Sequence, residues 1–444
     1  MGEAPAVDGL GTAATGPNLP PVVPVPEPIQ GIGFSVARRW TMRQAARRYG
    51  RVLTLKVPVY GHLVVVADPA LVRPVFTAST DDLVNIQPNL SRIFGPGSVF
   101  ALDGADHRKR RKLLTPPFHG QSIKNYEKII EEETLREIAR WPEGSEFRSL
   151  EPMSRITLNV ILRAVFGADG AELDELRRLM PGWVTLGSRL ATLPRPPRQL
   201  GGRGPWGRLA EYHREFDTMI NDLIDKAESD PCFDERTDIL ALMLHSRYDD
   251  GSAISRSDMS DELLTLLGAG HETTASTLGW AFERLSRHPN ILAGLAEEAD
   301  AGGGELRQAT ILEVQRARTV IDLAGRRVAA PIFELGEWRI PRGYSIVVSI
   351  TQLHDDPDVF PQPERFDPYR FIGTKPPTFA WVPFGGGTRR CIGAAFANAE
   401  MDVVLRTVLH HFTIEPTTAP GEKVHSRGVA YTPKSGGRIV VHRR

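Results

Sequence analysis

One cysteine in this sequence stands where a reactive or metal-binding thiolate would be expected. Residues 384–393 read FGGGTRRCIG, so Cys391 follows three glycines and precedes Gly393. Glycines permit backbone angles closed to other residues, which lets amide N–H groups turn toward the sulfur. The alanine-rich stretch after Gly393 predicts a helix whose N-terminus favours a thiolate and whose small side chains admit a broad, planar group. A lone cysteine is otherwise a small buried hydrophobe, an alternative that the glycines and adjacent arginines disfavour.

The same glycines do not fit a nucleotide-binding loop. A phosphate loop ends in Gly-Lys-Ser/Thr, whereas this sequence has Gly387-Thr388-Arg389. A dinucleotide fingerprint needs a glycine at the position of Arg390. The glycines therefore point to the cysteine and not to a phosphate group.

A second unusual stretch, AGHETT, begins at Ala269 within a segment of helical periodicity. Glycine, a carboxylate and two threonines are poor residues for a helix interior, and a threonine hydroxyl can bond a carbonyl one turn back. We therefore expect a kink at Ala269-Gly270. Glu272 and Thr273 are an adjacent acid and alcohol that could pass protons to a ligand over the kink. A zinc-protease helix would need histidine where Ala275 stands, and a solvated polar patch is the remaining alternative.

Acidic and basic residues at helical spacing form two further patterns. Glu313 and Arg316 are three apart and share one helix face, although such a pair alone is usually a surface salt bridge. Arg365, in a stretch rich in proline and aromatic residues, could join them in a buried Arg–Glu–Arg cluster, since a lone buried arginine is costly. His107 and Arg111 are four apart on one predicted helix face and could grip a carboxylate.

Composition excludes several classes of protein. The 444 residues contain 54 basic and 54 acidic side chains, and this zero net charge argues against a nucleic-acid binder. Two cysteines rule out a disulfide framework and a cysteine-rich metal site, and they suit a reducing, cytoplasmic setting. The sequence has no apolar run of the ~18 residues that a membrane span needs, and no signal peptide.

The elements that must position these residues are mainly helical. Periodicity is helical over most of 105–320, a hairpin is expected at 51–67, and strands are expected at 343–350 and 438–442. The predicted fold class is therefore mainly α, with small β-sheets near the two ends of the chain.

The longest helix is predicted over 258–287. Asp258 and Ser260 are its expected caps, and His288-Pro289 ends it. About 30 residues at 1.5 Å each give a helix ~45 Å long, enough to cross a whole domain.

Two domain-level features are expected. Residues 1–28 hold seven prolines and predict a proline-rich arm on the surface of a single domain at 29–444. A disordered tail is the alternative for the first half of this arm. Residues 194–207, rich in proline, arginine and glycine, lie between helical segments and predict a long mobile loop instead of a domain boundary.

Together, in this order, these segments resemble the cytochrome P450 family of haem-thiolate monooxygenases. The family pattern Phe-Gly-x-Gly-x-Arg-x-Cys-x-Gly is matched in full at 384–393, and Ala/Gly-Gly-x-Asp/Glu-Thr is matched at 269–273. Its Glu-x-x-Arg, Pro-x-Arg-Phe and His-x-x-x-Arg patterns are matched by Glu313 and Arg316, by Pro363, Arg365 and Phe366, and by His107 and Arg111. The Pro-Pro step that many relatives have after Glu-x-x-Arg is missing. That leaves the haem-binding arginine of the next strand open between Arg326 and Arg327.

The resemblance implies a triangular helical prism around haem b, with a long kinked central helix. Cys391 would be the axial iron ligand, and the haem propionates would be neutralised by Arg389, His107, Arg111 and Arg326. The other cofactor-binding residues implied are Phe384, Gly385, Gly387 and Gly393 beside the cysteine, and Ala269 and Gly270, which would leave room for dioxygen. Glu272 and Thr273 would relay protons, and Glu313, Arg316 and Arg365 would be structural.

Electrons are expected from separate proteins, because the 53 residues after Cys391 (444 − 391) are too few for a flavin module. The resemblance implies a ferredoxin and a ferredoxin reductase. An acidic ferredoxin would dock near the basic residues Arg108, Lys109, Arg110 and Lys112. The alternative is a merely solvated basic face.

A hydrophobic small molecule is the expected substrate, of lipid-like, terpenoid or aromatic character. Family positions suggest as pocket residues Phe94, Val99, Phe100, Trp183, Leu186, Ala269 and Val429, any of which could equally be plain core. Competing interpretations are a peroxide-driven haem-thiolate enzyme or rearrangement catalyst, a non-catalytic haem sensor, and a helical scaffold without cofactor.

Overall fold

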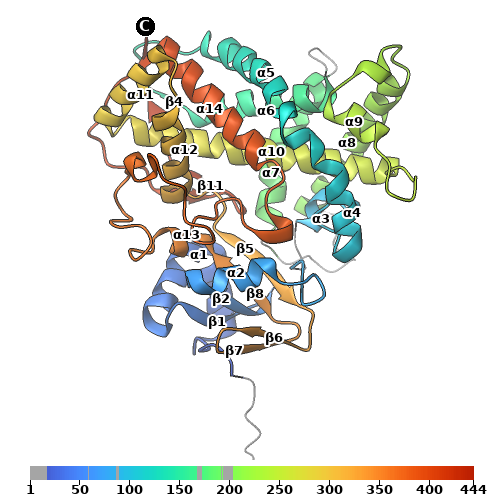
Figure 1. Ribbon diagram of the computed structural model, residues 1–444, viewed down its shortest axis with the longest axis vertical. Coiled ribbons are helices and arrows are strands. Elements are labelled where there is room, and N and C mark those ends of the chain that lie inside the picture. Colours follow the sequence, from blue (N-terminus) through green and yellow to red (C-terminus); the bar gives the residue numbers. More distant parts are fainter. Residues whose placement is uncertain (1–17, 59, 87–89, 168–172, 192, 194–203) are drawn as a thin grey trace, which may run out of the picture.

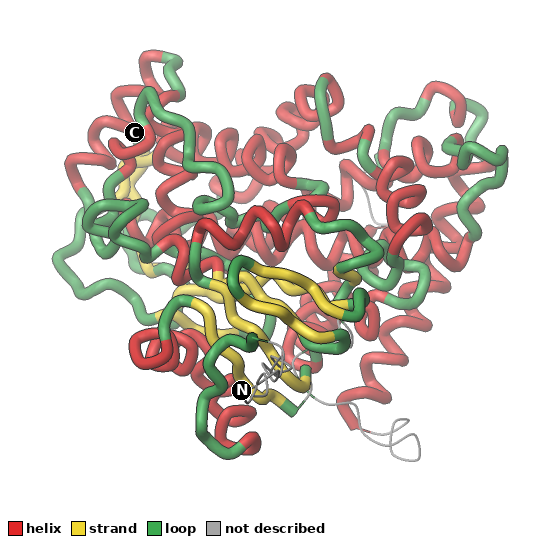
Figure 2. Tube along the Cα trace, turned by 60° about the horizontal axis from the view of Figure 1, so that its bottom comes forward, coloured by secondary structure: helices red, strands yellow, loops and turns green. Residues whose placement is uncertain are grey.

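The structure is a computed structural model, and it describes residues 18–58, 60–86, 90–167, 173–191, 193 and 204–444. Helices make up one part of the molecule, and most strands gather in the other (Figure 1). Figure 2 shows the strands side by side, with helices behind and around them. The fold class expected from periodicity, mainly α with small sheets, is confirmed.

The central helix α10 (Arg256–Leu285) has 30 residues and is buried along most of its length. It begins two residues before the predicted start, and its cap is Ser255, whose hydroxyl accepts the Asp258 N–H. The predicted caps are wrong because both side chains have other partners. Asp258 accepts from Arg110 at 2.8 Å, and Ser260 donates to Asp217 at 2.6 Å.

Other helices surround α10. Those on its flanks are α6 (Leu150–Phe166), α7 (Asp174–Leu190), α8 (Gly204–Glu228), α12 (Glu305–Ala317) and α14 (Ala394–His411). The outer helices are α5 (Gln121–Ile138), α9 (Ile239–His245) and α11 (Pro289–Ala301). Three shorter helices come early in the sequence: α2 (Pro69–Thr77), α3 (Ser91–Phe94) and α4 (Gly104–Leu114). The largest cluster of buried apolar side chains fills the spaces between the long helices.

A five-stranded sheet has the order β1-β2-β8-β5-β3. Its strands are β1 (Val52–Val57), β2 (Gly61–Val66), β8 (Ser345–Ser349), β5 (Leu323–Val328) and β3 (Leu83–Val84). The predicted hairpin is confirmed as β1 and β2, with Leu53 opposite Val65, and β8 lies parallel to β2. All of β8 is buried, as expected for a strand covered on both faces.

Four small sheets pair strands that are distant or adjacent in the chain. They are β6 (Ile332–Leu335) with β7 (Trp338–Pro341), β9 (Phe412–Ile414) with β13 (Val441–Arg443), β10 (Val424–Ser426) with β11 (Tyr431–Pro433), and β12 (Arg438–Ile439) with β4 (Phe147–Arg148). The strand expected at 438–442 is therefore two strands, each in a different sheet.

The N-terminal segment follows the first strand before turning into a helix. Thr54 N–H donates to Pro21 O at 2.8 Å and Val23 N–H donates to Thr54 O at 3.0 Å. Helix α1 (Glu27–Tyr49) then begins, so position 28 lies in its first turn. Most of the predicted arm, residues 1–17, lies outside the described residues.

The remaining expectations have mixed outcomes. Residues 204–207 form the first turn of α8, so the predicted loop is too long at its C-terminal end, and its residues 194–203 lie outside the described part of the chain. Across the described residues, no helix combines the length and apolar character that crossing a bilayer requires.

Candidate functional site

A cavity of about 510 Å³ lies between α10 and the loop that carries Cys391. Its walls come from segments far apart in the sequence: α1, α4, α7, α10, β5, the 384–393 loop and the start of α14. The fold therefore brings together most of the residues that the sequence patterns single out.

The glycine loop owes its shape to close contact with α2. Gly385 and Gly387 have φ of +67° and +65°, which side chains disfavour. A Cβ on Gly387 would lie 1.8 Å from the Phe76 carbonyl oxygen, so no larger residue fits there. The Cys391 N–H donates to Phe384 O at 2.9 Å and closes the loop. Local geometry thus fixes where the thiol points.

The Cys391 side chain is open to the cavity and otherwise enclosed by protein. Burial raises the pKa of its thiol, while the Gly393 N–H, Arg390 and Arg111 act in the opposite direction. A Cβ on Gly393 would meet nothing within 4 Å. Together with Ala397 on the next turn, Gly393 leaves open space at the cavity wall beside the sulfur. The arrangement can ligate a metal at the centre of a broad group.

Four cationic or titratable side chains converge on the cavity beside the loop: His107, Arg111, Arg326 and Arg389. Arg326 donates to Gly386 O at 3.1 Å, and Arg111 donates to Arg390 O at 2.6 Å. Among the described residues, the acid that pairs with this cluster is Asp103, which accepts from Arg389. The cluster therefore holds more positive than negative charge and suits a ligand with carboxylates.

Burial and repulsion between positive charges lower the pKa of two side chains in this cluster. Burial and then the charges of Arg389, Arg111 and Arg326 lower the pKa of His107 to about 4. Burial and then Arg389 lower the pKa of Arg326 to about 10. Buried His107 Nδ1 also lacks a hydrogen-bond partner. An anion among these side chains would relieve both the repulsion and the unpaired nitrogen.

Because side chains alternate along β5, Arg326 and Arg327 lie on opposite faces of the strand, and a haem-binding role for Arg326 stays a prediction. Arg326 is buried and lines the cavity, whereas Arg327 is exposed on the other face of the strand. The sequence left this choice open because the register of β5 against its neighbours was unknown. In the structure Arg326 lies opposite Ile346 of β8.

The polar stretch of α10 lines the same cavity as Cys391, and the kink at Ala269-Gly270 stays a prediction. The helix is continuous through Ala269 and Gly270. Thr273 Oγ1 donates to Ala269 O at 2.8 Å, and Thr157 of α6 donates to His271 O at 3.0 Å. Side-chain hydroxyls thus bond these carbonyls without breaking the helix. Both Ala269 and Gly270 line the cavity, as do Glu272 and Thr273.

Glu272 has a partner that the sequence did not reveal. Its Oε1 lies 3.5 Å from Nη1 of Arg427, in the turn between β10 and β11. Burial raises the pKa of Glu272, and Arg427 opposes the shift. No spacing rule links positions that are so far apart in the chain.

The Glu313–Arg316 pair is fully buried on α12, with Arg316 Nε and Nη2 each 2.7 Å from a carboxylate oxygen of Glu313. The prediction that Arg365 completes this cluster is wrong. Its side chain is exposed, and only its carbonyl accepts from Arg316. Arg370 takes the expected place, with Nε 3.3 Å from Glu313. Asp367 N–H also donates to Glu313, so the meander folds around this carboxylate.

The cavity wall formed by α3, the segment after it and α7 is apolar. The Phe94 and Phe100 rings stack with centroids 5.4 Å apart, and Phe94 lies 5.2 Å from Trp183. A Cβ on Gly268 would meet Trp183 at 2.6 Å, so this glycine lets α10 approach the aromatic side chains. Six predicted pocket residues line the cavity: Phe94, Val99, Phe100, Trp183, Ala269 and Val429. Leu186 does not, and packs against the core instead.

The basic run on α4 is less uniform than its sequence implies. Arg110 is buried and donates to Glu262 at 2.9 Å and to Asp258 at 2.8 Å. The prediction that Arg110 belongs to a docking surface is therefore wrong. Lys112 pairs with Asp249 at 2.7 Å. Arg108 and Lys109 remain exposed with Lys112.

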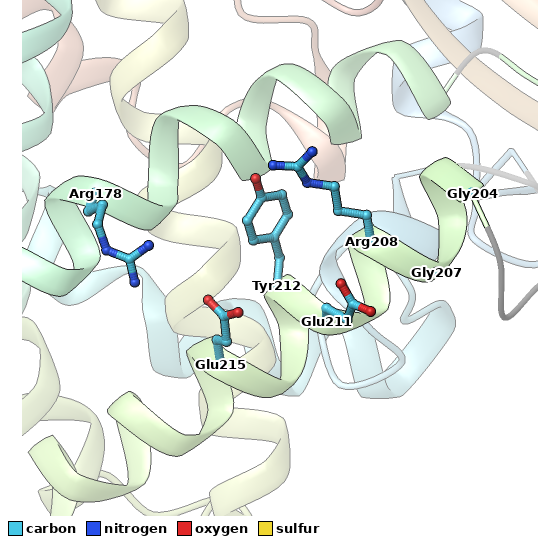
Figure 3. Close-up of a pocket in the computed structure, with 7 residues that line it drawn as sticks. All are labelled: Arg178, Gly204, Gly207, Arg208, Glu211, Tyr212 and Glu215. Atoms are coloured by element: carbon cyan, nitrogen blue, oxygen red, sulfur yellow. The ribbon is translucent and has the colours of Figure 1, made fainter.

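A second pocket, of about 490 Å³, lies between α7 and α8 (Figure 3). Figure 3 shows Tyr212 and Glu215 of α8 on one side of it and Arg178 of α7 on the other. Arg178 pairs with Glu175 at 2.6 Å, and both side chains are exposed. The side chains that line this pocket are polar and solvated. They do not converge on one point, as the side chains around Cys391 do.

Buried Glu400 of α14 was also missed by the sequence analysis. Both of its carboxylate oxygens lack a hydrogen-bond partner, and burial raises its pKa well above the usual range. Thr274, which lines the cavity, is the neighbouring group that opposes the shift. A glutamate within an otherwise apolar helix face would have been the available sequence signal.

Comparisons with known proteins agree with this geometry. The sequence model of the family described as cytochrome P450 matches residues 20–439. A Mycobacterium tuberculosis protein with the provisional name cytochrome P450 138 is 67% identical over 436 residues, covering 98% of this chain and 99% of the relative. Another, provisionally named cytochrome P450 135B1, is 38% identical over 404 residues, covering 89% of this chain and 85% of that relative.

Two solved structures share the fold. A retinoic-acid-bound cyanobacterial CYP120A1 superposes with a TM-score of 0.85 at 23% identity, covering 97% of this chain and all of the other. The haem domain of cytochrome P450DA gives 0.80 at 23% identity, covering 96% of this chain and 98% of the other. With the thiol, the small-residue wall and the cationic cluster around one cavity, the residues present fit a haem with its two carboxylates. This chain belongs to the cytochrome P450 family of haem-thiolate monooxygenases.

Proposed function

We propose that this protein inserts one oxygen atom of dioxygen into a hydrophobic organic substrate, using electrons from separate redox proteins. The observation that carries the proposal is the placement of Cys391 opposite the Glu272–Thr273 stretch across one cavity with an apolar wall. A thiol, a proton-bearing pair and an apolar chamber are the parts that such a reaction needs.

The cofactor proposed is haem b. Cys391 would ligate its iron, and His107, Arg111, Arg326 and Arg389 would bind its propionates. A cysteine-ligated haem supplies reductive cleavage of dioxygen, which electron density from the thiolate favours. The Gly393 N–H, directed at the sulfur, would tune that thiolate.

The residues of α10 would manage protons. The Thr273 hydroxyl, held by its bond to Ala269 O, would offer a proton at the cavity wall. Glu272 would resupply it, because burial raises the pKa of this carboxyl and lets it hold a proton. Arg427 would orient Glu272 from the C-terminal hairpin.

The substrate class follows from the wall opposite the cationic cluster. Phe94, Phe100 and Trp183 surround space next to α10 and bring no charge to it. A hydrophobic molecule would bind there by burial of its own apolar surface. Binding would also displace water from the neighbourhood of Thr273.

Electrons would come from a ferredoxin, itself reduced by a ferredoxin reductase. Exposed Arg108, Lys109 and Lys112 of α4, together with exposed Arg390 beside Cys391, support an acidic partner on this side. Both cysteines are free, which supports a cytoplasmic location.

The deciding experiment is the absorbance spectrum of the reduced protein with and without carbon monoxide. A strongly red-shifted Soret band is expected, because thiolate ligation changes the electronic structure of the haem. Cys391→Ala should lose this band, whereas Cys232→Ala, at an exposed cysteine that does not line the cavity, should keep it. A haem band without the shift, or a shifted band retained in Cys391→Ala, would contradict the assignment.

A further inference from the structure

The loop after α3, residues 95–100, forms part of the apolar wall of the cavity. Its Val99 and Phe100 side chains line the cavity, and the Phe100 ring stacks on Phe94. Residues 95–100 belong to no helix or strand, so groups from other elements must satisfy much of their backbone. The contacts that hold this loop therefore determine the shape of the wall.

Polar groups of α10 bind the loop directly. The Gly97 N–H donates to Asp261 Oδ2 at 2.7 Å. One turn further along the helix, Thr265 Oγ1 donates to Ser98 Oγ at 2.7 Å. A Cβ on Gly95 would lie 2.1 Å from Asp261 Oδ1, so this close approach requires a glycine. The loop is thus fitted to the first turns of α10.

Arg110 of α4 connects the loop to the same helix. Its guanidinium donates to the Gly97 carbonyl and, at 2.9 Å, to Glu262 Oε1. It also donates to Asp258 and to the Tyr248 hydroxyl, each at 2.8 Å. Arg110 is 4% exposed and Glu262 is 0% exposed. One buried guanidinium therefore links α4, the loop and α10, and charge-assisted bonds of this kind are strong.

The Arg110–Glu262 pair lies outside the lining of the cavity, because neither residue lines it. Removing one partner of a buried pair leaves the other charge without compensation, so the surrounding backbone must rearrange. Here that backbone includes Gly97, two residues before Val99. The pair can therefore affect what the cavity binds without touching the bound molecule.

We propose that Arg110 and Glu262 are positioning residues that determine how tightly the cavity binds large hydrophobic molecules. With the pair intact, the loop stays against α10 and presents Val99 and Phe100 as part of one closed apolar surface. With the pair broken, the loop moves, and a molecule that fills the cavity loses contact with it. This inference rests on the proposed function, since it concerns the same cavity and its test reads binding at the haem iron.

The pair has a titration of its own. Burial raises the pKa of Glu262 to about 7, and Arg110 and the Val99 N–H act in the opposite direction. The other titratable groups of this cluster are Asp258 and Asp261 on α10, Tyr248 before it, and, next to Asp261, His213 and Asp217 on α8. Above this pKa Glu262 is charged and attracts Arg110, and below it the carboxyl is neutral and the attraction is weaker.

The test compares two ligands of the haem iron in the full-length, haem-loaded protein. Imidazole is small and binds mainly through the iron, whereas clotrimazole is an imidazole with three phenyl rings that also need an apolar cavity. Each ligand shifts the Soret band, so titration gives both Kd values. Glu262→Gln keeps the shape of the side chain. At about pH 8 it should weaken clotrimazole binding about threefold or more and leave imidazole binding unchanged.

The pH dependence distinguishes this role from a merely structural one. At about pH 6 most of the Glu262 carboxyl in the unsubstituted protein holds a proton and resembles glutamine. The two proteins should therefore bind clotrimazole alike at that pH. Titration of the ligand itself cancels, because both proteins are measured at each pH. A merely structural role would give the same difference at both.

Two further variants locate the effect. Arg110→Met should weaken clotrimazole binding at about pH 8 by at least as much as Glu262→Gln, since it also removes the bond to Gly97. Arg307→Met is the matched control. Arg307 is also buried and donates to Asp402 at 2.6 Å, and neither of these two residues lines the cavity. This variant should bind clotrimazole like the unsubstituted protein.

Three results would overturn the proposal. The first is unchanged clotrimazole binding in Glu262→Gln at the higher pH, and this variant decides alone if Arg110→Met does not fold. The second is a loss that is equal for imidazole or equal at both pH values. The third is a similar loss in Arg307→Met. A protein that gives no Soret shift even with imidazole would instead contradict the proposed function, and this inference with it.

Discussion

Glu272 of the central helix lies 3.5 Å from Arg427 of the C-terminal hairpin, Oε1 to Nη1. The acid at the cavity wall is therefore oriented by a residue from the other end of the chain. Since Arg427 favours the ionised carboxyl, its presence limits how far burial raises the pKa of Glu272.

Arg427→Gln should raise the pKa of Glu272 further, because the one interaction that favours its charged form is removed. In the proposed reaction, the pH at which the proton supply from Glu272 is half lost should move upward. The measurement is the pH profile of product formed per reductant consumed. Arg438→Gln, which breaks an exposed pair with Glu146, is the control and should leave the profile in place.

Thr273→Ala should keep the haem spectrum but lower product yield per reductant consumed by about tenfold or more, since a positioned proton-transfer group contributes about 10²–10⁴-fold to a rate. Ser276→Ala is a matched control. Ser276 makes the same kind of bond to the carbonyl one turn back, Ser276 Oγ to Glu272 O at 2.6 Å, but does not line the cavity. Equal yields in the two variants would remove Thr273 from the proton path.

Glu400→Gln should stabilise the protein more at about pH 8 than at about pH 5. The pKa of Glu400 is raised by burial in the folded state, so the folded chain holds a proton that the unfolded chain releases above about pH 4.3. The free energy of unfolding therefore falls as the pH rises toward the folded pKa, and glutamine removes this loss. Thermal unfolding at both pH values measures it, with exposed Glu297→Gln as the control. A variant that is equally or less stable than the unsubstituted chain at the higher pH would show that Glu400 has a partner.

Arg316→Met should destabilise the fold by about 3–5 kcal/mol, because it leaves the buried Glu313 carboxylate without its bidentate partner. Arg365→Ala should cost less than about 1 kcal/mol, since its side chain is exposed and lies 3.9 Å from Asp367. Urea unfolding gives both values. A large loss in Arg365→Ala would argue against the placement of Arg370 in the cluster.

Patterns within one element predicted the site well. The glycine loop, the Glu313–Arg316 pair and the His107–Arg111 face depend on neighbours a few residues apart, and local spacing fixes such neighbours. The predictions that failed concerned contacts between different elements. Arg110 and Arg365 were assigned from their positions in a run or motif, but their surroundings are set by α10 and the meander.

The poor helix propensity of residues 269–274 does not interrupt α10. Propensity describes an isolated helix, whereas the packed neighbours of α10 and its own threonine hydroxyls support an unbroken one. Arg326 could not be chosen over Arg327 because strand register depends on pairing with β8, which no local pattern contains. Arg427 had no sequence signal at all.

The contact between Gly387 and the backbone of Phe76 has a consequence for biogenesis. The loop that holds Cys391 packs directly on the backbone of α2, which is made far earlier during synthesis. Closing so long a stretch of chain is entropically costly and slow. The ligand loop should therefore be among the last parts to mature, and cofactor capture should report that the N-terminal sheet and the C-terminal helices have assembled.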